Sequence, residues 1–245
     1  EKDSAKTTIQ VYDNYNKLIR TLKQQPTKGF NRLFWELDVK GVRMPDDAKP
    51  KPDANERGGR SVTPGNYKVV FSYDTFKDST MVEVKLDPKI QMSVSELNEK
   101  AELIDNFSSL ASGITAKVEQ LNESKETVDL ILSKLKEQVK NETNNRLKQE
   151  ADSTKSKINK LIARINPPDD IQGFSRNPEL VEEQLSNARR YLQDVLYPVN
   201  ETQKRVLAVT EKNIRPVMDD VDSFFRTDWE AFKKAVSDAN FSLFK

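Results

Sequence analysis

The spacing of apolar residues changes near residue 90. Up to that point, apolar and polar residues alternate in short runs, a pattern typical of strands with two different faces. Polar turns separate the runs, with "NYN" at 14–16 and Pro64-Gly65 as the clearest examples. These runs predict a small antiparallel β-sandwich over residues 1–90. The runs are "TTIQVYD" (7–13), "KLIRTL" (17–22), "FNRLFWELDV" (30–39), "PGNYKVVFSYD" (64–74) and "TMVEVKL" (80–86).

A long polar segment interrupts the predicted strands. Residues 44–63 read "MPDDAKPKPDANERGGRSVT", which is rich in proline, glycine and charge. This composition is typical of an exposed loop. Its basic residues could contact an anion, but acidic residues in the same segment offset them. Gly58-Gly59 belongs to neither of the glycine-rich phosphate-binding motifs, so we interpret 44–63 as a long exposed connection.

After Asp87-Pro88 the apolar residues recur every three or four positions, which predicts helices and no further strand. A first helix begins at the capping box formed by Ser93 and Glu96 and carries an apolar stripe over 94–121. A second carries a stripe over 128–165, and its middle, "KNETNNR" (140–146), has no apolar anchor, so it extends past the other helices or bends there.

Two further helices complete the prediction. Asn177-Pro178 is typical of the start of a third helix, which Tyr197-Pro198 ends. Asn200 and Gln203 cap a fourth helix, in which Pro216 is expected to produce a kink. We therefore predict an α+β protein, in which residues 91–245 form a four-helix antiparallel bundle with an aromatic C-terminal segment.

Composition removes several classes of chemistry. The chain contains no histidine and no cysteine, which excludes Ser-His-Asp and Cys-His catalysis and any metal or haem site with these ligands. We expect no cofactor and no metal. The formal net charge of +1 gives no overall attraction for nucleic acid, and no apolar run is long enough for a membrane span.

Aromatic residues supply the candidate binding positions. Trp35, in the predicted strand 30–39, could stack on a sugar ring or fill the sandwich core, and the core is the favoured interpretation. The tail 224–244, "FFRTDWEAFKKAVSDANFSLF", holds more aromatic residues than one helix face needs. Phe225, Trp229 and Phe241 therefore either seal the end of the bundle or form a partner surface.

Carboxylates, with lysine and tyrosine, are the remaining general acid–base groups. They cluster at Asp46-Asp47, at Asp169-Asp170 and at Asp219, Asp220 and Asp222. A glycosidase needs two carboxyl groups about 5–9.5 Å apart across a cleft. None of these clusters is framed by apolar residues that would raise a pKa, so solvated surface charge is the favoured interpretation.

Several segments together resemble the C-terminal part of a bacterial protein family. The similar elements are "KGFNRLFWELDVKGVRMP" with Asn31 and Trp35, the turn at 64–67, and Asp87-Pro88. Members carry an N-terminal β-propeller related to sortilin/VPS10 domains, with BNR (Asp-box) repeats, and are often labelled glycosyl hydrolases. The resemblance implies an immunoglobulin-like or fibronectin III-like module, also similar to flagellar hook-cap domains, followed by helices with an aromatic end. It also implies export to the periplasm or cell surface.

The propeller itself is absent, since this chain contains no Asp-box of the type Ser-x-Asp-x-Gly-x-Thr-Trp. No catalytic residue is therefore carried over. The leading hypothesis is a non-catalytic region that supports or docks the propeller of a larger exported protein. The second is an accessory module that binds glycan or a cell-envelope partner through exposed aromatic residues. The third is a glycosidase or peptidase that uses carboxylates alone.

Overall fold

A computed structural model describes residues 6–51, 54–137, 141–166, 177–193 and 197–239. It contains an antiparallel sheet part and a helical part, with 54% helix and 18% strand, which confirms the α+β class. The chain divides into two compact units. The sheet unit comprises 1–43, 47–109 and 192–204, and the helical unit comprises 44–46, 110–191 and 205–245. The predicted division at residue 90 marks the change of secondary structure, and its role as a domain border stays a prediction.

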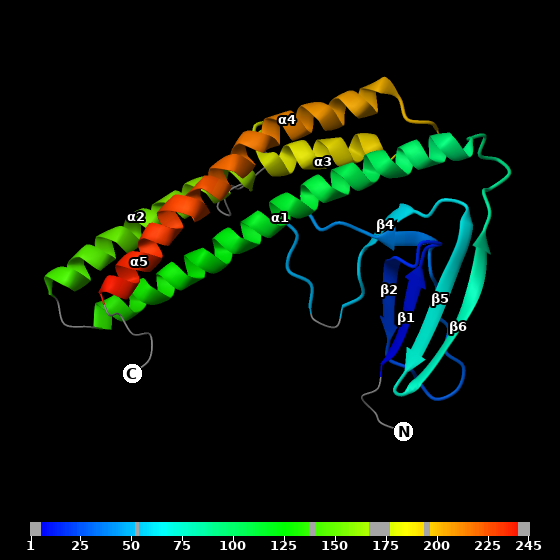
Figure 1. Cartoon of the computed structure of the whole chain (residues 1–245), viewed down its shortest axis with the longest axis horizontal. Helices are drawn as coiled ribbons and strands as arrows, with labels where there is room; N and C mark the ends of the chain where they lie inside the picture. Colours follow the sequence, from blue (N-terminus) through cyan, green and yellow to red (C-terminus); the bar gives the residue numbers. More distant parts are fainter. Residues whose placement is uncertain (1–5, 52–53, 138–140, 167–176, 194–196, 240–245) are drawn as a thin grey trace. The chain divides into compact units, whose positions relative to one another are not determined.

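Four antiparallel strands form the main sheet. They are β1 (Thr7–Tyr12), β2 (Leu18–Gln24), β5 (Gly65–Tyr73) and β6 (Phe76–Val84), in the order β2-β1-β5-β6 (Figure 1). The predicted turn at 14–16 joins β1 to β2, where Asp13 Oδ1 accepts hydrogen bonds from the backbone N–H groups of Tyr15 and Lys17, both 2.9 Å. These four strands confirm four of the runs that the alternation predicts.

The core of this unit lies on one face of the sheet. Val11, Tyr67 and Val84 are buried there. Val11 pairs with Val69 across β1 and β5, and Tyr67 pairs with Val82 across β5 and β6, so alternate residues of neighbouring strands meet on this face. The partly buried residues packed against this cluster are Ile9, Ile19, Trp35, Val62, Val69 and Val82.

The prediction of a strand over 30–39 is wrong for most of its length. Only β3 (Asp38–Lys40) is a strand, and it pairs with β4 (Gly58–Ser61) in a separate two-stranded sheet. The backbone before β3 cannot continue as a strand because Leu37 has φ 56°, in the left-handed region.

The loop predicted over 44–63 also contains a strand, since β4 lies within it. Glycine permits this pairing because the backbone of β3 comes very close. A Cβ atom on Gly59 would lie 2.8 Å from the carbonyl oxygen of Lys40, and one on Gly58 would collide with the carboxylate of Asp38. The pair Gly58-Gly59, which composition alone assigns to a loop, is therefore part of a small sheet.

The first two helices differ from the prediction at their border. Helix α1 (Val94–Glu137) is continuous through residues 121–128, and α2 (Glu142–Ile165) follows it. The break falls at the start of the polar segment 140–146, where the backbone N–H of Asn144 donates to Asn141 Oδ1, the N-cap, at 2.7 Å. The capping box at the start of α1 is confirmed, since Ser93 N–H donates to Glu96 Oε2 at 2.7 Å and Glu96 N–H to Ser93 Oγ at 3.2 Å.

The remaining helices are α3 (Val181–Leu192), α4 (Glu201–Phe224) and α5 (Glu230–Asp238), with the π-helical segment η1 (Phe225–Trp229) between the last two. Helix α3 begins later than predicted, because Asn177 Oδ1 accepts from Glu179 N–H in a turn that precedes it. The predicted cap of α4 is confirmed by reciprocal bonds between Asn200 and Gln203, 3.0 and 3.1 Å long. Pro216 lies inside α4.

Ion pairs link the helices of the helical unit across their partly exposed borders. Lys155 of α2 lies 2.5 Å from Asp129 of α1, and Arg164 of α2 lies 2.6 Å from Asp220 of α4. Fully buried apolar side chains from α1, α2, α3 and α4 supply the interior. They include Ile114, Leu121, Val128, Ile158, Ile165, Leu185, Ile214 and Val221.

Candidate functional site

Residues 27–37, here called the aromatic loop, replace most of the predicted third strand. The side chain of Asn31 fixes the turn at its start. Asn31 Oδ1 accepts from the backbone N–H of Thr27 at 2.8 Å, and Asn31 Nδ2 donates to the carbonyls of Thr27 and Gly29, at 2.8 and 3.1 Å. Gly29 has φ 100°, a conformation that other residues rarely adopt. The conformation of this turn is therefore fixed by residues of the turn itself, Gly29 and Asn31.

The aromatic loop presents Phe30 and Phe34 to solvent. Phe30 has a relative exposure of 107% and Phe34 of 66%. The guanidinium of Arg32 lies 5.9 Å from the centre of the Phe34 ring, within the range of a cation–π interaction. Lys28 is exposed on the same turn. The aromatic loop therefore combines large apolar side chains with two cations on an ordered backbone.

Trp35, in contrast, packs within the sheet unit. Its indole N–H donates to the backbone carbonyl of Asp38 at 2.8 Å, and its ring meets Tyr67 edge to face, with the ring centres 5.6 Å apart. It also packs against the buried cluster on the sheet. A direct binding role for Trp35 stays a prediction, which these contacts do not favour, because the polar group of the indole already has a partner.

The two described candidates in the C-terminal segment belong to one aromatic cluster. The rings of Phe225 and Trp229 lie 6.4 Å apart, and those of Trp229 and Phe232 lie 5.6 Å apart. Phe224 and Phe232 are buried, whereas Phe225 and Trp229 are half-buried. Phe225 and Trp229 are the first and last residues of the π-helical segment η1, and both rings contact this cluster. The fourth tentative binding residue, Phe241, lies outside the described residues.

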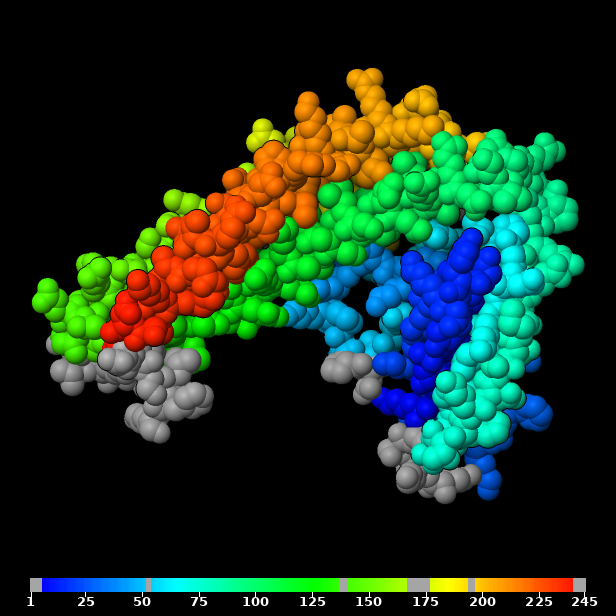
Figure 2. All heavy atoms as spheres, in the orientation of Figure 1, coloured from blue at the N-terminus to red at the C-terminus, as the bar shows by residue number. Residues whose placement is uncertain are grey.

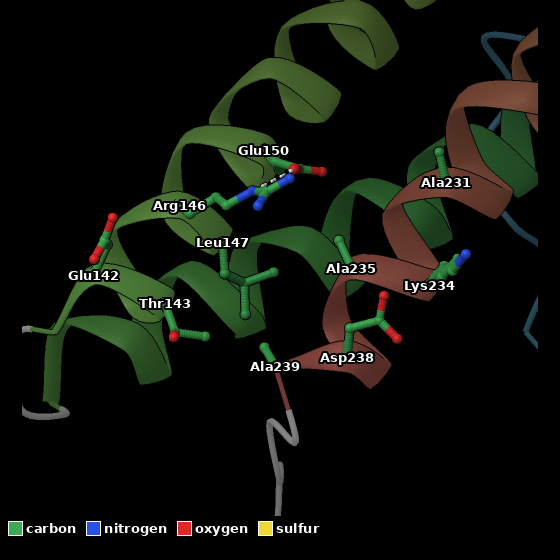
Figure 3. Close-up of a pocket in the computed structure, with 10 residues that line it drawn as sticks. All are labelled: Glu142, Thr143, Arg146, Leu147, Glu150, Ala231, Lys234, Ala235, Asp238 and Ala239. Carbon is green, nitrogen blue, oxygen red and sulfur yellow. Dashed lines mark ion pairs between the residues drawn. The ribbon is translucent and has the colours of Figure 1, made fainter.

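A hollow of about 510 Å³ lies between the first part of α2 and helix α5 (Figure 3). Ala231, Ala235 and Ala239 line one side of it, at intervals of one helical turn, and Leu147 lines the other. Its charged residues carry both signs, and the Arg146 Nε atom pairs with a Glu150 carboxylate oxygen at 3.6 Å. Small apolar side chains beside mixed charges suit a polypeptide segment better than an apolar small molecule. The other lining residues are Glu142, Thr143, Lys234 and Asp238.

Most of the acidic clusters are engaged in ion pairs. Asp47 lies 2.6 Å from Arg57, Asp220 pairs with Arg164, and Asp222 pairs with Lys117. The cluster at 169–170 lies outside the described residues. Within the described ranges, no group of three or more acidic residues could hold a metal ion.

One carboxyl group of the helical unit has a raised pKa. Burial raises the pKa of Glu182 on α3, and the negative charges of Asp46 and Glu183 raise it further. The structure therefore brings Asp46, one of the predicted acidic candidates, near a carboxylate on a distant part of the sequence. Glu182 is the group in which a general acid would be tested first.

None of the helices in the described ranges has the length and apolar composition that a membrane span requires. Comparisons with protein-family models, with curated proteins and with solved structures give no match to this chain.

Proposed function

We propose that this chain is a non-catalytic interaction region of a larger exported protein, and that it docks the β-propeller of that protein through the aromatic loop. The observation that carries this proposal is the full exposure of Phe30 on a turn that Asn31 holds in place. Phe34, four residues later, is a second exposed aromatic side chain of the same loop. The choice of the propeller as the partner rests on the resemblance described above.

Burial of the two phenyl rings is the main source of the proposed binding energy. Complete burial of one such side chain contributes roughly 1.5–3 kcal/mol. A few aromatic anchors of this kind usually dominate the binding energy of an interface. Because the side chain of Asn31 already orders the turn, binding costs less conformational entropy than it would for a flexible loop.

The charges flanking the rings define the partner surface further. Lys28 and Arg32 are both exposed. Cations at the rim of an interface accelerate association with an acidic surface and exclude basic ones. The complementary surface on the propeller therefore has apolar pockets for Phe30 and Phe34 and acidic residues around them.

The proposal includes the finer architecture. The four-stranded sheet and the β3-β4 sheet form a small sandwich of the immunoglobulin or fibronectin III class, and the helices form an antiparallel bundle. Trp35 supports the first statement, because its ring lies in the segment that leads into β3 and packs on the cluster of the larger sheet. A sandwich of this kind would hold the aromatic loop on a rigid base.

The second candidate function, binding of glycan or of a cell-envelope partner, uses the same two rings. Exposed aromatic faces stack on sugar rings as well as on protein surfaces. Phe30 and Phe34 carry this alternative better than Trp35 does, since the indole of Trp35 is engaged with Asp38 and Tyr67. Both candidates therefore predict the same sensitive residues and differ in the ligand.

The deciding experiment measures binding of this chain to the separately produced propeller from the same reading frame. Phe30→Ser and Phe34→Ser should each weaken binding at least about tenfold, the effect of about 1.4 kcal/mol. Tyr15→Ser is the matched control, because Tyr15 is 86% exposed on a different turn, and it should bind normally. A reading frame that encodes no propeller, or binding that Phe30→Ser leaves unchanged, would overturn the docking proposal.

Two further assays separate the rival functions. Sedimentation with insoluble cell-wall polysaccharide that Phe30→Ser abolishes would favour the glycan-binding alternative. Hydrolysis of glycosides or peptides by the wild-type chain that Glu182→Gln removes, with folding intact, would establish the third hypothesis of carboxylate catalysis. We expect neither activity above background.

A further inference from the structure

The two edge strands of the main sheet, β2 and β6, differ in whether their outward backbone groups have hydrogen-bond partners. At the β2 edge, side chains from the segment before β4 take up the outward backbone N–H groups. Thr21 N–H donates to Glu56 Oε2 at 2.9 Å, and Lys23 N–H donates to Asn55 Oδ1 at 2.6 Å. These bonds close the edge to another strand, a common way in which proteins prevent edge pairing.

The β6 edge is the opposite border of this sheet (Figure 2). In an antiparallel pair, alternate residues direct both backbone groups away from the partner strand. The N–H of Ser79 donates to the side chain of its neighbour Asp78, at 2.7 Å. This bond places Ser79 among the residues of β6 that direct both backbone groups away from β5, here called the outward set. Lys77, Met81 and Glu83 belong to the same set, because they alternate with it along the strand. Among the described residues, no other segment hydrogen-bonds to these outward groups.

We propose that β6 pairs with β6 of a second copy of this chain, so that two sheets join into one. In the antiparallel arrangement in which the nine residues overlap completely, Phe76 faces Val84 and Thr80 faces its own copy. Lys77 of each copy then faces Glu83 of the other copy. Residues of the outward set meet residues of the outward set, as backbone pairing requires.

The charges favour this register over its neighbours. A shift by two residues in one direction places Lys77 opposite Lys85, and a shift in the other direction removes both Lys–Glu pairs. Lys77 and Glu83 are both exposed, and Glu83 lies 3.3 Å from Lys85, which follows the end of β6 in the same copy. Charged residues on an edge strand usually oppose pairing, but here they are placed so that two copies are complementary.

The resulting contact has two-fold symmetry, in which each residue pair occurs twice. Exposed apolar side chains lie along it as well, since Met81 has a relative exposure of 63% and Phe76 of 59%. Met81 faces Ser79 of the second copy, on the same side of the sheet as the Lys–Glu pairs. The contact is separate in sequence from the aromatic loop, so it does not depend on the proposed docking function.

The first test removes the outward N–H of one residue. Sedimentation equilibrium of the full chain over a wide concentration series should show reversible dimers. Met81→Pro should abolish them, because proline cannot donate a hydrogen bond and is tolerated on edge strands. Met81→Ala, which keeps the N–H, is the control and should still dimerise. A wild-type chain that is monomeric throughout the series, or a Met81→Pro variant that is folded and dimeric, would overturn the proposal.

The second test uses the charge pattern. Lys77→Glu places two pairs of carboxylates opposite each other, and Glu83→Lys places two pairs of ammonium groups opposite each other. Each variant alone should self-associate at least about tenfold more weakly than the wild type. An equimolar mixture of the two should regain dimers, because both carboxylates of one variant then face the two ammonium groups of the other. Dimers that both single variants retain, or a mixture that stays monomeric, would exclude this register.

Discussion

The guanidinium of Arg20 on β2 lies 3.1 Å from the carboxylate of Asp38 at the start of β3, and both residues are buried. Arg20 also donates to the backbone carbonyls of Glu56 and Arg57, at 2.9 and 2.6 Å. One side chain thus connects the main sheet, the two-stranded sheet and the segment that leads into β4. Burial raises the pKa of Asp38, although the charge of Arg20 opposes this shift.

Removal of Arg20 should therefore leave a buried carboxylate without its cation. We expect Arg20→Met to lower the free energy of unfolding of the sheet unit by about 3 kcal/mol at pH 7, as for other broken buried ion pairs. The pKa of Asp38 is already raised by burial, and removal of the Arg20 charge should raise it further, so the folded variant holds this proton to higher pH than the unfolded chain and loses stability as pH rises. The deficit should therefore shrink as the pH falls toward 4.

Urea melts at several pH values, followed by circular dichroism, measure this deficit. Lys68→Met is the control, because Lys68 is exposed on β5, and it should change stability by less than about 0.5 kcal/mol. A deficit that grows on acidification would contradict the assignment of the lost stability to Asp38.

Trp35 and Phe30 lie five residues apart in the sequence but differ in burial, so their replacement by alanine should change the free energy of unfolding by different amounts. Trp35 contacts Tyr67 and the core cluster, so Trp35→Ala should cost about 3 kcal/mol, the lower end of the range for a truncated aromatic residue, because the ring is only half-buried. Phe30 is fully exposed, so Phe30→Ala should cost less than about 0.5 kcal/mol. Denaturant melts followed by near-ultraviolet circular dichroism compare the two. Equal effects would contradict the division of this segment into a packed part and an exposed part.

The elements that the sequence predicts correctly are those determined by residues close to one another in the chain. The strands β1, β5 and β6 follow from alternation and from turn residues beside them, and the helix caps at Ser93 and Asn200 follow from spacing over three residues. The segment 30–39 also alternates, but the positive φ of Leu37 and the bond between Trp35 and Asp38 depend on its place in the folded unit. The apolar spacing does not place the border between α1 and α2 correctly, because Val128 and Ile131 continue the buried stripe of α1.

The candidate site is harder to predict, for a physical reason. Phe30 and Phe34 are the residue types that usually fill a core, and composition alone gives no sign of their exposure. Gly29 and Asn31 provide the available signal, since both favour tight turns and stand at the start of the predicted strand. Together, Gly29 and Asn31 favour a turn at Phe30, whereas the alternation of apolar residues favours a strand.

The contribution of the capping box of α1 to stability should depend on pH. Hydrogen bonds from the backbone and side chain of Ser93 to its carboxylate lower the pKa of Glu96. A lowered pKa in the folded state contributes stability that is present above the ordinary value of 4.5 and is lost as the pH falls below it. Glu96→Gln should therefore be less stable than the wild type at neutral pH, and the difference should disappear in acid. Thermal melts from pH 7 to pH 3 test this, and Glu102→Gln, in the same helix, serves as the control.

The aromatic cluster at the end of the helical unit provides the last prediction. Phe232 is 2% exposed, and its ring lies 5.6 Å from that of Trp229. Phe232→Ala should therefore cost about 3–5 kcal/mol and move the fluorescence of Trp229 toward longer wavelength, because water reaches the indole. Leu130→Ala is the control, since Leu130 is 47% exposed on α1, and it should leave both quantities nearly unchanged. If Phe232→Ala melts like the wild type, the aromatic residues of this segment do not stabilise the helical unit, and the alternative of a partner surface on Phe225 and Trp229 would be strengthened.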